Sequence, residues 1–381
     1  MVQLPSGKRI EHLRRSQGLP RRVLAERVGR SEEWLRQIER GKRELDSISV
    51  LTRLAEILPF DNISQVVGPV SEAAPQRGSG SWATEIIFPP SDQPGENPMT
   101  DNALHTAWDA WQFSPNRYTN TRKALSGLLG SAGSGTAENM AESYRLMSSV
   151  LRHEGAGDLA LLTAEMACEQ ARTTRQPLLV AAARGSLAEA LGSAGRSREA
   201  RTVARSTVDL LNDVDEKDAV RLSVVGTAHL TAALAAAAEG DHNGAEALAD
   251  QASAVADLIG EERNDLRTSF GPLDVSAHAV RIDVRLGRYR RALRTADRTD
   301  IHRMFSRERR ARHFIAVAAA YSFERDAPGG VFALCRAEEA CPEELRFHPH
   351  VPAILERLME LECATVRPEL LRIARRSRAD T

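Results

Sequence analysis

The stretch LAERVGRSEEWLRQIERG, residues 24–41, decides the fold of the N-terminal part of the chain. It reads as two short helices joined by a tight turn at Gly29. Ser31 is placed to cap the second helix, in which Leu35 and Ile38 lie three residues apart on one apolar face. Gly41 ends that helix. Two short helices joined across a glycine-containing turn form a helix-turn-helix unit.

The flanking segments extend this unit into a small helical head. GKRIEHLRRSQG, residues 7–18, places Ile10 and Leu13 on one face and ends at Gly18. Pro20 suits the first turn of the following helix. SISVLTRLAEIL, residues 47–58, predicts a fourth helix with the apolar residues Ile48, Leu51, Leu54, Ala55 and Leu58.

This head resembles the Cro and lambda-repressor type of helix-turn-helix, also called XRE, over about residues 7–60. The resemblance depends on the spacing of the core residues and on the turn glycine. It implies that the head binds DNA and that the helix after Gly29 enters the major groove. The matching positions are Leu24, Ala25, Val28, Gly29, Ser31, Leu35, Ile38, Glu39 and Gly41.

The resemblance implies that four exposed positions of the recognition helix meet base edges. A carboxylate accepts from cytosine, glutamine pairs with adenine and arginine with guanine. The two acidic residues also suit the positive end of the helix dipole, so capping charge is an equally valid interpretation of them. The expected base-reading residues are Glu32, Glu33, Arg36 and Gln37.

Basic residues around the recognition helix are expected to neutralise phosphates without reading sequence. Arg14 and Glu39 match a family pair that holds the first and third helices together, so we assign them to structure. Trp34 stands where the family has a small polar residue; packing is favoured over stacking on a sugar. The expected phosphate contacts are Arg21, Arg40, Lys42 and Arg43.

Composition and charge agree with a two-part, cytoplasmic, all-α protein. The 381 residues exceed one ordinary domain, and 42% apolar with 27% charged residues is typical of soluble proteins. Residues 1–60 carry a net charge of +5 and the remainder −6, which favours polyanion binding at the head. The N-terminus lacks the apolar core of a signal peptide. The uncharged run Leu222–Ala238 carries Thr227, His229 and Thr231, which predicts a buried helix and not a membrane span.

We expect three regions along the chain: a head at 1–62, a linker at 63–103 and a body at 104–381. The linker is rich in Gly, Pro and Ser, which predicts a flexible connection. Within it WATEIIF, residues 82–88, is apolar and predicts either a short strand or a segment that docks on a neighbouring surface.

The body contains a helical repeat marked by glycines 40, 45 and 47 residues apart, at Gly155, Gly195, Gly240 and Gly287. Alanines follow each glycine after five and nine residues, and Ala333 and Ala337 indicate a further copy. The paired positions are Ala160 and Ala164, Ala200 and Ala204, Ala245 and Ala249, and Ala292 and Ala296.

This spacing resembles the tetratricopeptide repeat, although the period exceeds 34 residues and most framework aromatics are missing. The resemblance implies an α-solenoid with a concave groove, which suits a peptide or a charged small molecule. Solvated charges on an ordinary helical surface are the alternative. The expected groove residues are Glu142, Arg145, Ser149, Glu189, Thr227, Asp274, Arg281 and Arg285.

Aromatic residues gather just before the repeats, at Trp108, Trp111, Phe113 and Tyr118. They either cap the solenoid or line a site, and capping is favoured because aromatic side chains bury large apolar areas.

Neither a cofactor nor a metal is expected. Cys341, His348, His350 and Cys363 have zinc-binding side chains, but their spacing matches no familiar site. The sequence also lacks a phosphate-binding loop, a nucleophile elbow and a recognisable acid–base pair, so we do not expect an enzyme.

Together these features predict a bacterial transcription regulator that binds double-stranded operator DNA as a homodimer. Its body would dimerise and bind a peptide or small-molecule effector. The architecture resembles that of peptide-pheromone-responsive regulators of Gram-positive bacteria. The alternative is an adaptor, held at DNA by its head, whose groove binds a partner protein and no small effector.

Overall fold

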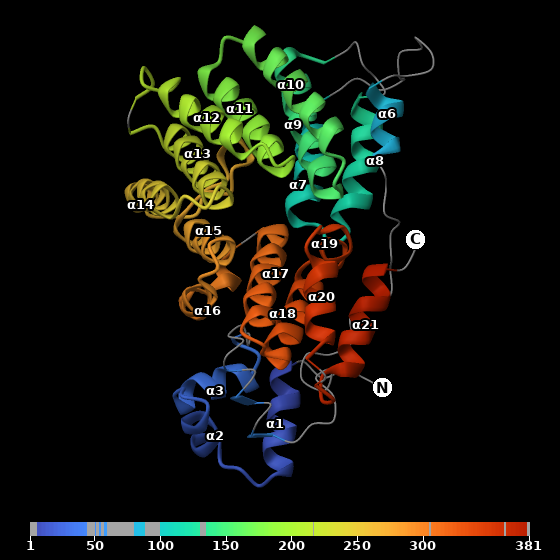
Figure 1. The fold of residues 1–381 in the computed structure, drawn as a ribbon, viewed down its shortest axis with the longest axis vertical. Coiled ribbons are helices and arrows are strands. Elements are labelled where there is room, and N and C mark those ends of the chain that lie inside the picture. The colour runs from blue at the N-terminus through green and yellow to red at the C-terminus, as the bar shows by residue number, and fades with distance from the viewer. Residues whose placement is uncertain are drawn as a thin grey trace.

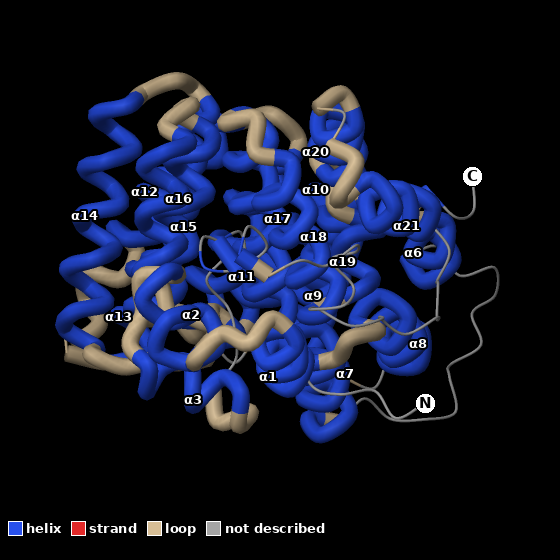
Figure 2. The backbone as a smooth tube through the Cα atoms, turned by 90° about the horizontal axis from the view of Figure 1, so that it is seen from below, coloured by secondary structure: helices blue, strands red, loops and turns tan. Residues whose placement is uncertain are grey.

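The computed structural model describes residues 6–43, 50, 53–54, 57–58, 80–87, 100–129, 135–215, 217–304, 306–361 and 363–378. The regular structure of these residues is helical throughout (Figure 2). One isolated antiparallel bridge, between Arg263 and Phe270, is the exception within these ranges. The expected all-α class is confirmed.

The head begins with three helices, α1 (Ser6–Ser16), α2 (Arg21–Arg27) and α3 (Glu32–Glu39). Its core is apolar: Ile10, Leu24 and Leu35 are fully buried. Gly29 adopts a φ of +71° between α2 and α3, in the left-handed region that favours glycine. The hydroxyl of Ser31 accepts from the Trp34 amide at 3.1 Å and caps α3 as predicted.

A fourth segment completes the head core. Val50, Leu54 and Leu58, four residues apart, are buried at 2%, 1% and 1% exposure. Arg53 donates to the Val28 carbonyl at 3.4 Å and ties this segment to α2. Of the predicted helix over 47–58, residues 50, 53, 54 and 57 are helical and Leu58 lies in a bend; Ile48, Leu51 and Ala55 lie outside the described residues.

The apolar segment in the predicted linker forms a helix, α6 (Ser81–Ile87), so the expectation of a strand is wrong. The expectation of a docking contact is confirmed. Ala83 is fully buried, and Trp82 Nε1 donates to Glu154 at 3.0 Å. A strand on this surface would have no partner for its backbone among the helices, whereas a helix satisfies its own hydrogen bonds.

The body continues with antiparallel helix pairs that stack on one another (Figure 1). A first pair, α7 (Asp101–Phe113) and α8 (Arg117–Leu129), precedes the repeats. The five repeat pairs are α9 (Ala137–Glu154) with α10 (Gly157–Thr173), α11 (Pro177–Ser193) with α12 (Ser197–Asp209), α13 (Ala219–Ala238) with α14 (His242–Ile259), α15 (Pro272–Arg285) with α16 (Tyr289–Arg298), and α17 (Arg307–Phe323) with α18 (Ala327–Ala340). The order of packing confirms the tetratricopeptide-like solenoid.

The glycines and alanines of the repeat occupy the predicted places. The first four pairs each turn at a glycine with φ between +72° and +82°: Gly155, Gly195, Gly240 and Gly287. In each turn the next amide donates back to the first helix, as Ala156 does to the Leu151 carbonyl at 2.9 Å. The repeat alanines are fully buried, with two exceptions nine residues after the turn glycine: Ala249 and Ala296 are half-buried. These small side chains let the two helices of a pair approach closely.

The fifth pair departs from the predicted register. The amide of Asp326 donates to the Tyr321 carbonyl at 3.0 Å, which places Arg325, with φ +61°, at the position of the turn glycine. The residue five positions later is therefore Gly330, and not Ala333 as the sequence pattern suggested. The predicted copy exists, but its alignment is wrong by three residues.

The two ends of the body meet through α8 and α19 (Pro342–Phe347). Arg117 Nη1 contacts Glu344 Oε2 at 2.7 Å, and the Tyr118 amide donates to Glu343 at 2.6 Å. The Arg117 guanidinium also lies 3.3 Å from the centroid of the Trp111 ring. Trp108, Trp111 and Tyr118 are buried, as capping requires, and Phe113 is half-buried.

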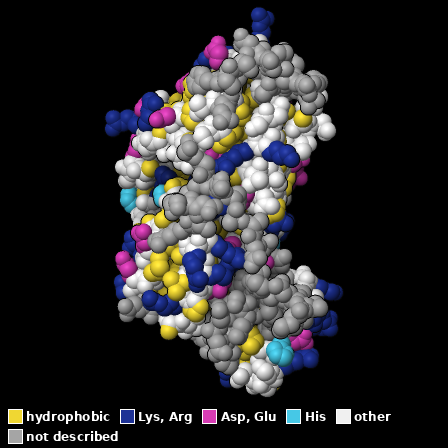
Figure 3. Space-filling model, turned by 90° about the vertical axis from the view of Figure 1, so that its right-hand side faces the viewer, with side chains coloured by type: hydrophobic (Ala, Val, Ile, Leu, Met, Phe, Trp, Pro, Cys, Tyr) yellow, Lys and Arg dark blue, Asp and Glu magenta, His cyan; other side chains and the backbone are white. Residues whose placement is uncertain are grey.

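Two further helices, α20 (Val351–Met359) and α21 (Arg367–Arg378), end the described chain next to α17 and α18. In Figure 1 these C-terminal helices lie directly above the head. On the face shown in Figure 3, charged side chains of both signs are interspersed with hydrophobic ones over the described surface.

One helix within the described ranges, Ala219–Ala238, is long and apolar enough to span a membrane. Of its most apolar window 61% is buried inside the protein, and a core helix passes the same test. It is the helix predicted from the run Leu222–Ala238.

Candidate nucleic-acid interface and ligand-binding face

The recognition helix α3 buries one face and leaves a polar face exposed. Glu32, Glu33 and Arg36 are exposed and Gln37 is half-exposed. Glu33 forms an ion pair with Arg36 and accepts a hydrogen bond from Gln37 Nε2 at 3.2 Å. Three of the four expected base-reading side chains therefore form one network on the exposed face of α3.

The base of α3 is fixed by a buried carboxylate. Arg14 donates from Nε to Glu39 Oε1 at 2.6 Å and from Nη2 to Oε2 at 3.2 Å. Glu39 is 1% exposed, and the predicted structural pair is confirmed. Arg21 Nε also donates to Glu39, at 2.8 Å. Arg21 thus contacts α3 directly, and its role at phosphate stays a proposal.

The remaining expected phosphate contacts follow α3. Arg40, Lys42 and Arg43 are exposed. Gly41 has a φ of +69°, and the Lys42 amide donates to the Gln37 carbonyl at 2.9 Å. This turn ends α3, so Lys42 and Arg43 lie beyond the end of the helix, and their role at phosphate stays a prediction.

Trp34 is a packing residue, as predicted, and the surface it packs against is the body, which the sequence did not indicate. Trp34 is 9% exposed, and its ring belongs to a hydrophobic cluster that also contains Ile301 and Phe314 of the body. A cavity of about 320 Å³ lies at this contact. It is lined from the head by Arg30, Trp34 and Arg43, and from the body by Leu293, Ala296, Asp297, Arg298, Thr299, Asp300, Ile301, His313, Phe314, Val317 and Tyr321.

The eight expected groove residues fall into two groups. Glu142, Ser149, Glu189, Thr227 and Arg281 are half-buried, and Arg285 is exposed. Arg145 and Asp274 are 5% and 0% exposed. For these two the expectation of an accessible position does not hold, because each forms polar contacts inside the body.

A loop between α14 and α15 covers Arg145. Arg145 Nη2 donates to the Leu266 carbonyl at 2.9 Å, and Gln112 Nε2 donates to the Arg267 carbonyl at 3.2 Å. Leu266 and Arg267 have φ values of +44° and +64°, which are uncommon for residues with a side chain. The loop contains the turn formers Gly260, Asn264 and Gly271, but Leu266 and Arg267 themselves carry no signal for a positive φ.

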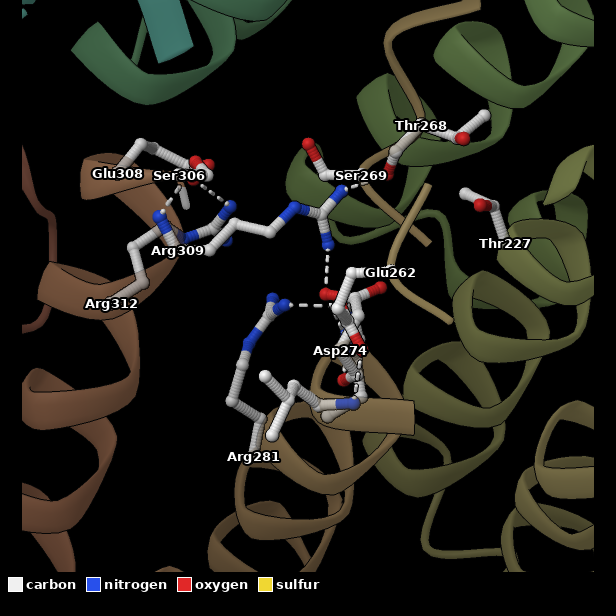
Figure 4. A network of polar contacts seen from close by, with 12 residues as sticks. Thr227, Glu262, Thr268, Ser269, Asp274, Arg281, Ser306, Glu308, Arg309 and Arg312 are labelled. Atoms are coloured by element: carbon white, nitrogen blue, oxygen red, sulfur yellow. Dashed lines mark hydrogen bonds and ion pairs between the residues drawn. The ribbon is translucent and has the colours of Figure 1, made fainter. Parts of the chain in front are cut away.

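Asp274 is held between α15 and α17. Arg309 pairs with its carboxylate and donates to the Thr268 carbonyl at 2.6 Å (Figure 4). His278 Nδ1 lies 3.3 Å from the same carboxylate. Burial acts to raise the pKa of Asp274, but the charges of Arg309 and His278 hold that pKa below its ordinary value. The residue therefore carries an ion pair and stabilises the contact between two repeats.

Glu189 and Thr227 also have partners within the body. Arg152 Nη2 donates to Glu189 at 2.7 Å, and the Thr227 hydroxyl donates to the Ser223 carbonyl at 2.8 Å. Their exposure leaves these side chains accessible, so their role toward a ligand stays a prediction.

The fold brings together a set of metal-binding side chains that differs from the four residues considered for zinc. Within the described part of the chain that set is His153, Glu308 and Glu344, all buried. Arg117 lies 3.8 Å from Glu308 and 2.7 Å from Glu344, and Arg312 lies 2.9 Å from Glu308. These guanidiniums already balance both carboxylates, so the set is best explained as an ion-pair network.

The head matches a known domain family. Residues 7–62 match the family model described as "Helix-turn-helix domain". The head is a helix-turn-helix domain. A comparison with curated protein sequences found no match.

Two solved structures show weaker similarity. The structure of Bacillus thuringiensis PlcR in complex with the peptide PapR7 and DNA is 14% identical, with a TM-score of 0.33; the match covers 67% of this chain and 95% of that chain. The structure of a Rap protein complexed with Competence and Sporulation Factor is 12% identical, with a TM-score of 0.45; it covers 97% and 99%. Similarity at these TM-scores carries no argument about function.

Proposed function

We propose that the protein is a cytoplasmic transcription regulator that reads operator DNA with α3. The observation that carries this proposal is a helix-turn-helix domain whose recognition helix turns its polar face to solvent. Glu32, Glu33, Arg36 and Gln37 on that face would contact base edges, and the network around Glu33 would orient Arg36 and Gln37. The protein acts by binding and not by catalysis.

The DNA complex is proposed to be a homodimer. A single helix-turn-helix domain buries little surface on DNA, and two half-sites raise affinity and specificity together. The half-sites would lie about 34–36 Å apart, one helical turn of DNA, or a multiple of that distance. Arg40, Lys42 and Arg43, with Arg21, would contact the phosphates that flank each half-site.

The contact between head and body is proposed to be the point of control. Arg30 and Arg43 of the head line the same cavity as Asp297 and Asp300 of the body. A carboxylate of this cavity that pairs with Arg43 would compete with DNA phosphate for it, because both partners use the same guanidinium donors. A ligand that changes how the body holds Trp34 would therefore change the affinity of the head for DNA.

The ligand is proposed to be a peptide or a charged small molecule bound on the inner face of the body. The groove residues that remain accessible, Arg281 and Arg285 among them, support this part of the proposal. Polar side chains of both signs on one helical surface favour a charged or peptide-like molecule over an apolar one.

The experiment is selection of bound fragments from genomic DNA by the purified full-length protein, with and without extract of the producing cells. The expected result is a palindromic motif whose enrichment changes when extract is added. A motif that ignores extract, together with a folded protein that co-purifies, would favour the adaptor. Absence of any enriched motif would contradict the proposed function.

A further inference from the structure

Five basic or titratable side chains come from three elements that pack together, with α17 in contact with both α15 and α20. Arg281 and Arg285 lie one turn apart on α15, and Arg312 projects from the neighbouring helix α17 (Figure 4 shows Arg281 and Arg312). His348 and His350 come from the turn before α20, with ring centroids 5.6 Å apart. We call these residues the basic cluster.

The basic cluster has too few counter-charges. Arg312 is the member with carboxylate partners, Glu308 at 2.9 Å and Glu344 at 4.0 Å. Arg281 Nη1 lies 3.1 Å from His278 Nε2, an imidazole nitrogen and not a carboxylate oxygen. In the part of the chain that the structure describes, neither Arg281 nor Arg285 has a carboxylate within ion-pair distance. Unpaired guanidiniums that face one another are costly, because their repulsion is not offset.

This crowding of positive charges lowers the pKa values of several members of the basic cluster. Burial, followed by the charges of Arg312, Arg285 and Arg309, lowers the pKa of Arg281 well below its ordinary value. Burial and the charges of Arg285, Arg312 and Arg281 likewise lower the pKa of His350. Arg281, His348 and His350 therefore experience the positive charges of other cluster members, whereas the carboxylates of Glu308 and Glu344 raise the pKa of Arg312.

A solute can reach the basic cluster. Arg285 and His350 are exposed, and Arg281 and His348 are half-buried behind them. The Nε of Arg312 is buried and has no hydrogen-bond partner among the described residues. The cluster thus has exposed side chains at one end and a buried N–H without a hydrogen bond at the other. This arrangement suits one anionic group bound at a defined place.

We propose that the basic cluster is an oxyanion site that binds the carboxylate or phosphate group of the effector. The two arginines of α15 lie at i and i+4, so both forks can meet a single group from one side. Charge-assisted bonds from guanidinium to carboxylate or phosphate are short and strong, and a bound oxyanion removes the repulsion described above. That the bound molecule is an effector rests on the proposed function; that an oxyanion binds does not.

The test uses the full-length protein and three probes at equal ionic strength: inorganic phosphate, a pool of random short peptides with free C-terminal carboxylates, and the same pool amidated. Thermal unfolding is compared for wild type, Arg285→Gln, the double variant Arg281→Gln/Arg285→Gln, and Arg205→Gln. Arg205 is an exposed arginine on the outer helix α12, so its variant is the matched control for loss of one positive charge.

Phosphate or the free-acid peptides, or both, should raise the unfolding midpoint of wild type and of Arg205→Gln, because a ligand that binds the native state stabilises it. Each removed arginine should weaken binding by roughly tenfold. Phosphate alone would identify a phosphate-bearing ligand, and the free-acid pool alone a peptide carboxylate. Equal responses in wild type and the double variant, or no response of wild type to either, would overturn the proposal.

A second readout needs no ligand. Without added oxyanion, Arg285→Gln should unfold at a higher temperature than wild type, since one repelling charge is gone, and added phosphate should narrow that difference. A lower midpoint at every phosphate concentration would contradict the site. Binding that leaves DNA affinity unchanged would sustain the oxyanion site and contradict ligand control of the head.

Discussion

Arg14 and Glu39, which lie 25 residues apart, are joined by two hydrogen bonds of 2.6 and 3.2 Å, and the carboxylate is 1% exposed. Glu39→Gln removes the charge that Arg14 and Arg21 share. Because breaking a buried ion pair leaves an uncompensated charge, the head should lose about 3–5 kcal/mol of stability. Urea unfolding followed by hydrogen exchange in α1 and α3 measures this loss.

Glu33→Gln is the matched control for Glu39→Gln on the same helix. Glu33 is about half exposed and pairs with Arg36, so its loss should cost at most about 0.5 kcal/mol. Equal losses for the two variants would show that the buried pair does not fix α3.

Gln37→Ala should change which base is read. An amide side chain pairs with one base edge, so the variant should lose about 1–3 kcal/mol at one base pair of the operator and keep its affinity elsewhere. Binding to a set of single-base operator variants measures the profile. An unchanged sequence preference would show that α3 is not the reading helix.

Lys42→Ala should weaken binding to all sequences alike. Lys42 is exposed beyond the end of α3, where we propose that its positive charge contacts phosphate and releases counterions. The slope of log affinity against log salt should fall by about one for each half-site. A loss confined to one base pair would contradict the phosphate role.

Arg325→Gly should stabilise the body. Arg325 has a φ of +61° at the turn of the fifth helix pair, where the first four pairs have glycine. Relief of backbone strain, less the extra freedom of glycine in the unfolded chain, should give about 0.5–1 kcal/mol in chemical denaturation. The reverse change, Gly155→Ala, should cost about 1 kcal/mol, since open space surrounds its added methyl and strain alone acts. A destabilised Arg325→Gly would show that the Arg325 side chain matters more than its backbone.

The stability of the protein should fall as pH drops below 6.5, partly through His313. Burial lowers the pKa of His313 from 6.5 to about 4. Between these values the unfolded chain binds the proton and the folded chain does not, so stability is present above pH 6.5 and is lost as pH falls toward 4. The contribution is about 1.4 kcal/mol per pH unit at most.

His313→Gln removes this titration. The stability difference between wild type and variant, measured by denaturation from pH 7.5 downward, should shift in favour of the variant as the solution becomes more acid. Parallel curves would show that His313 titrates normally in the folded protein.

Local patterns predicted the elements, whereas the long-range contacts of the body were not predicted; the pair Arg14–Glu39 in the head was predicted through the family resemblance. Gly155 and Ala160 act within one helix pair, so their spacing was readable from the sequence. Arg325 was not, because a left-handed turn at a non-glycine residue leaves no signal. Arg117 and Glu344 are separated by 227 residues, and no local pattern could show that they close the body.

The site divides in the same way. Arg281 and Arg285 were predictable as groove-facing residues on the first helix of a repeat, and the structure leaves Arg281 half-buried and Arg285 exposed. The participation of Arg312, His348 and His350 depends on how α17 and the turn before α20 pack against α15, which only the folded chain determines. WATEIIF failed as a strand because its apolar run fits a short buried helix equally well.

The most direct test of the central claim is a titration of the full-length protein with two duplexes of equal length at one salt concentration. One carries the motif obtained by selection and the other a scrambled version. Sequence-specific reading by α3 predicts at least about a thousandfold preference for the motif, reduced in Gln37→Ala. Equal affinities for the two duplexes would contradict the account.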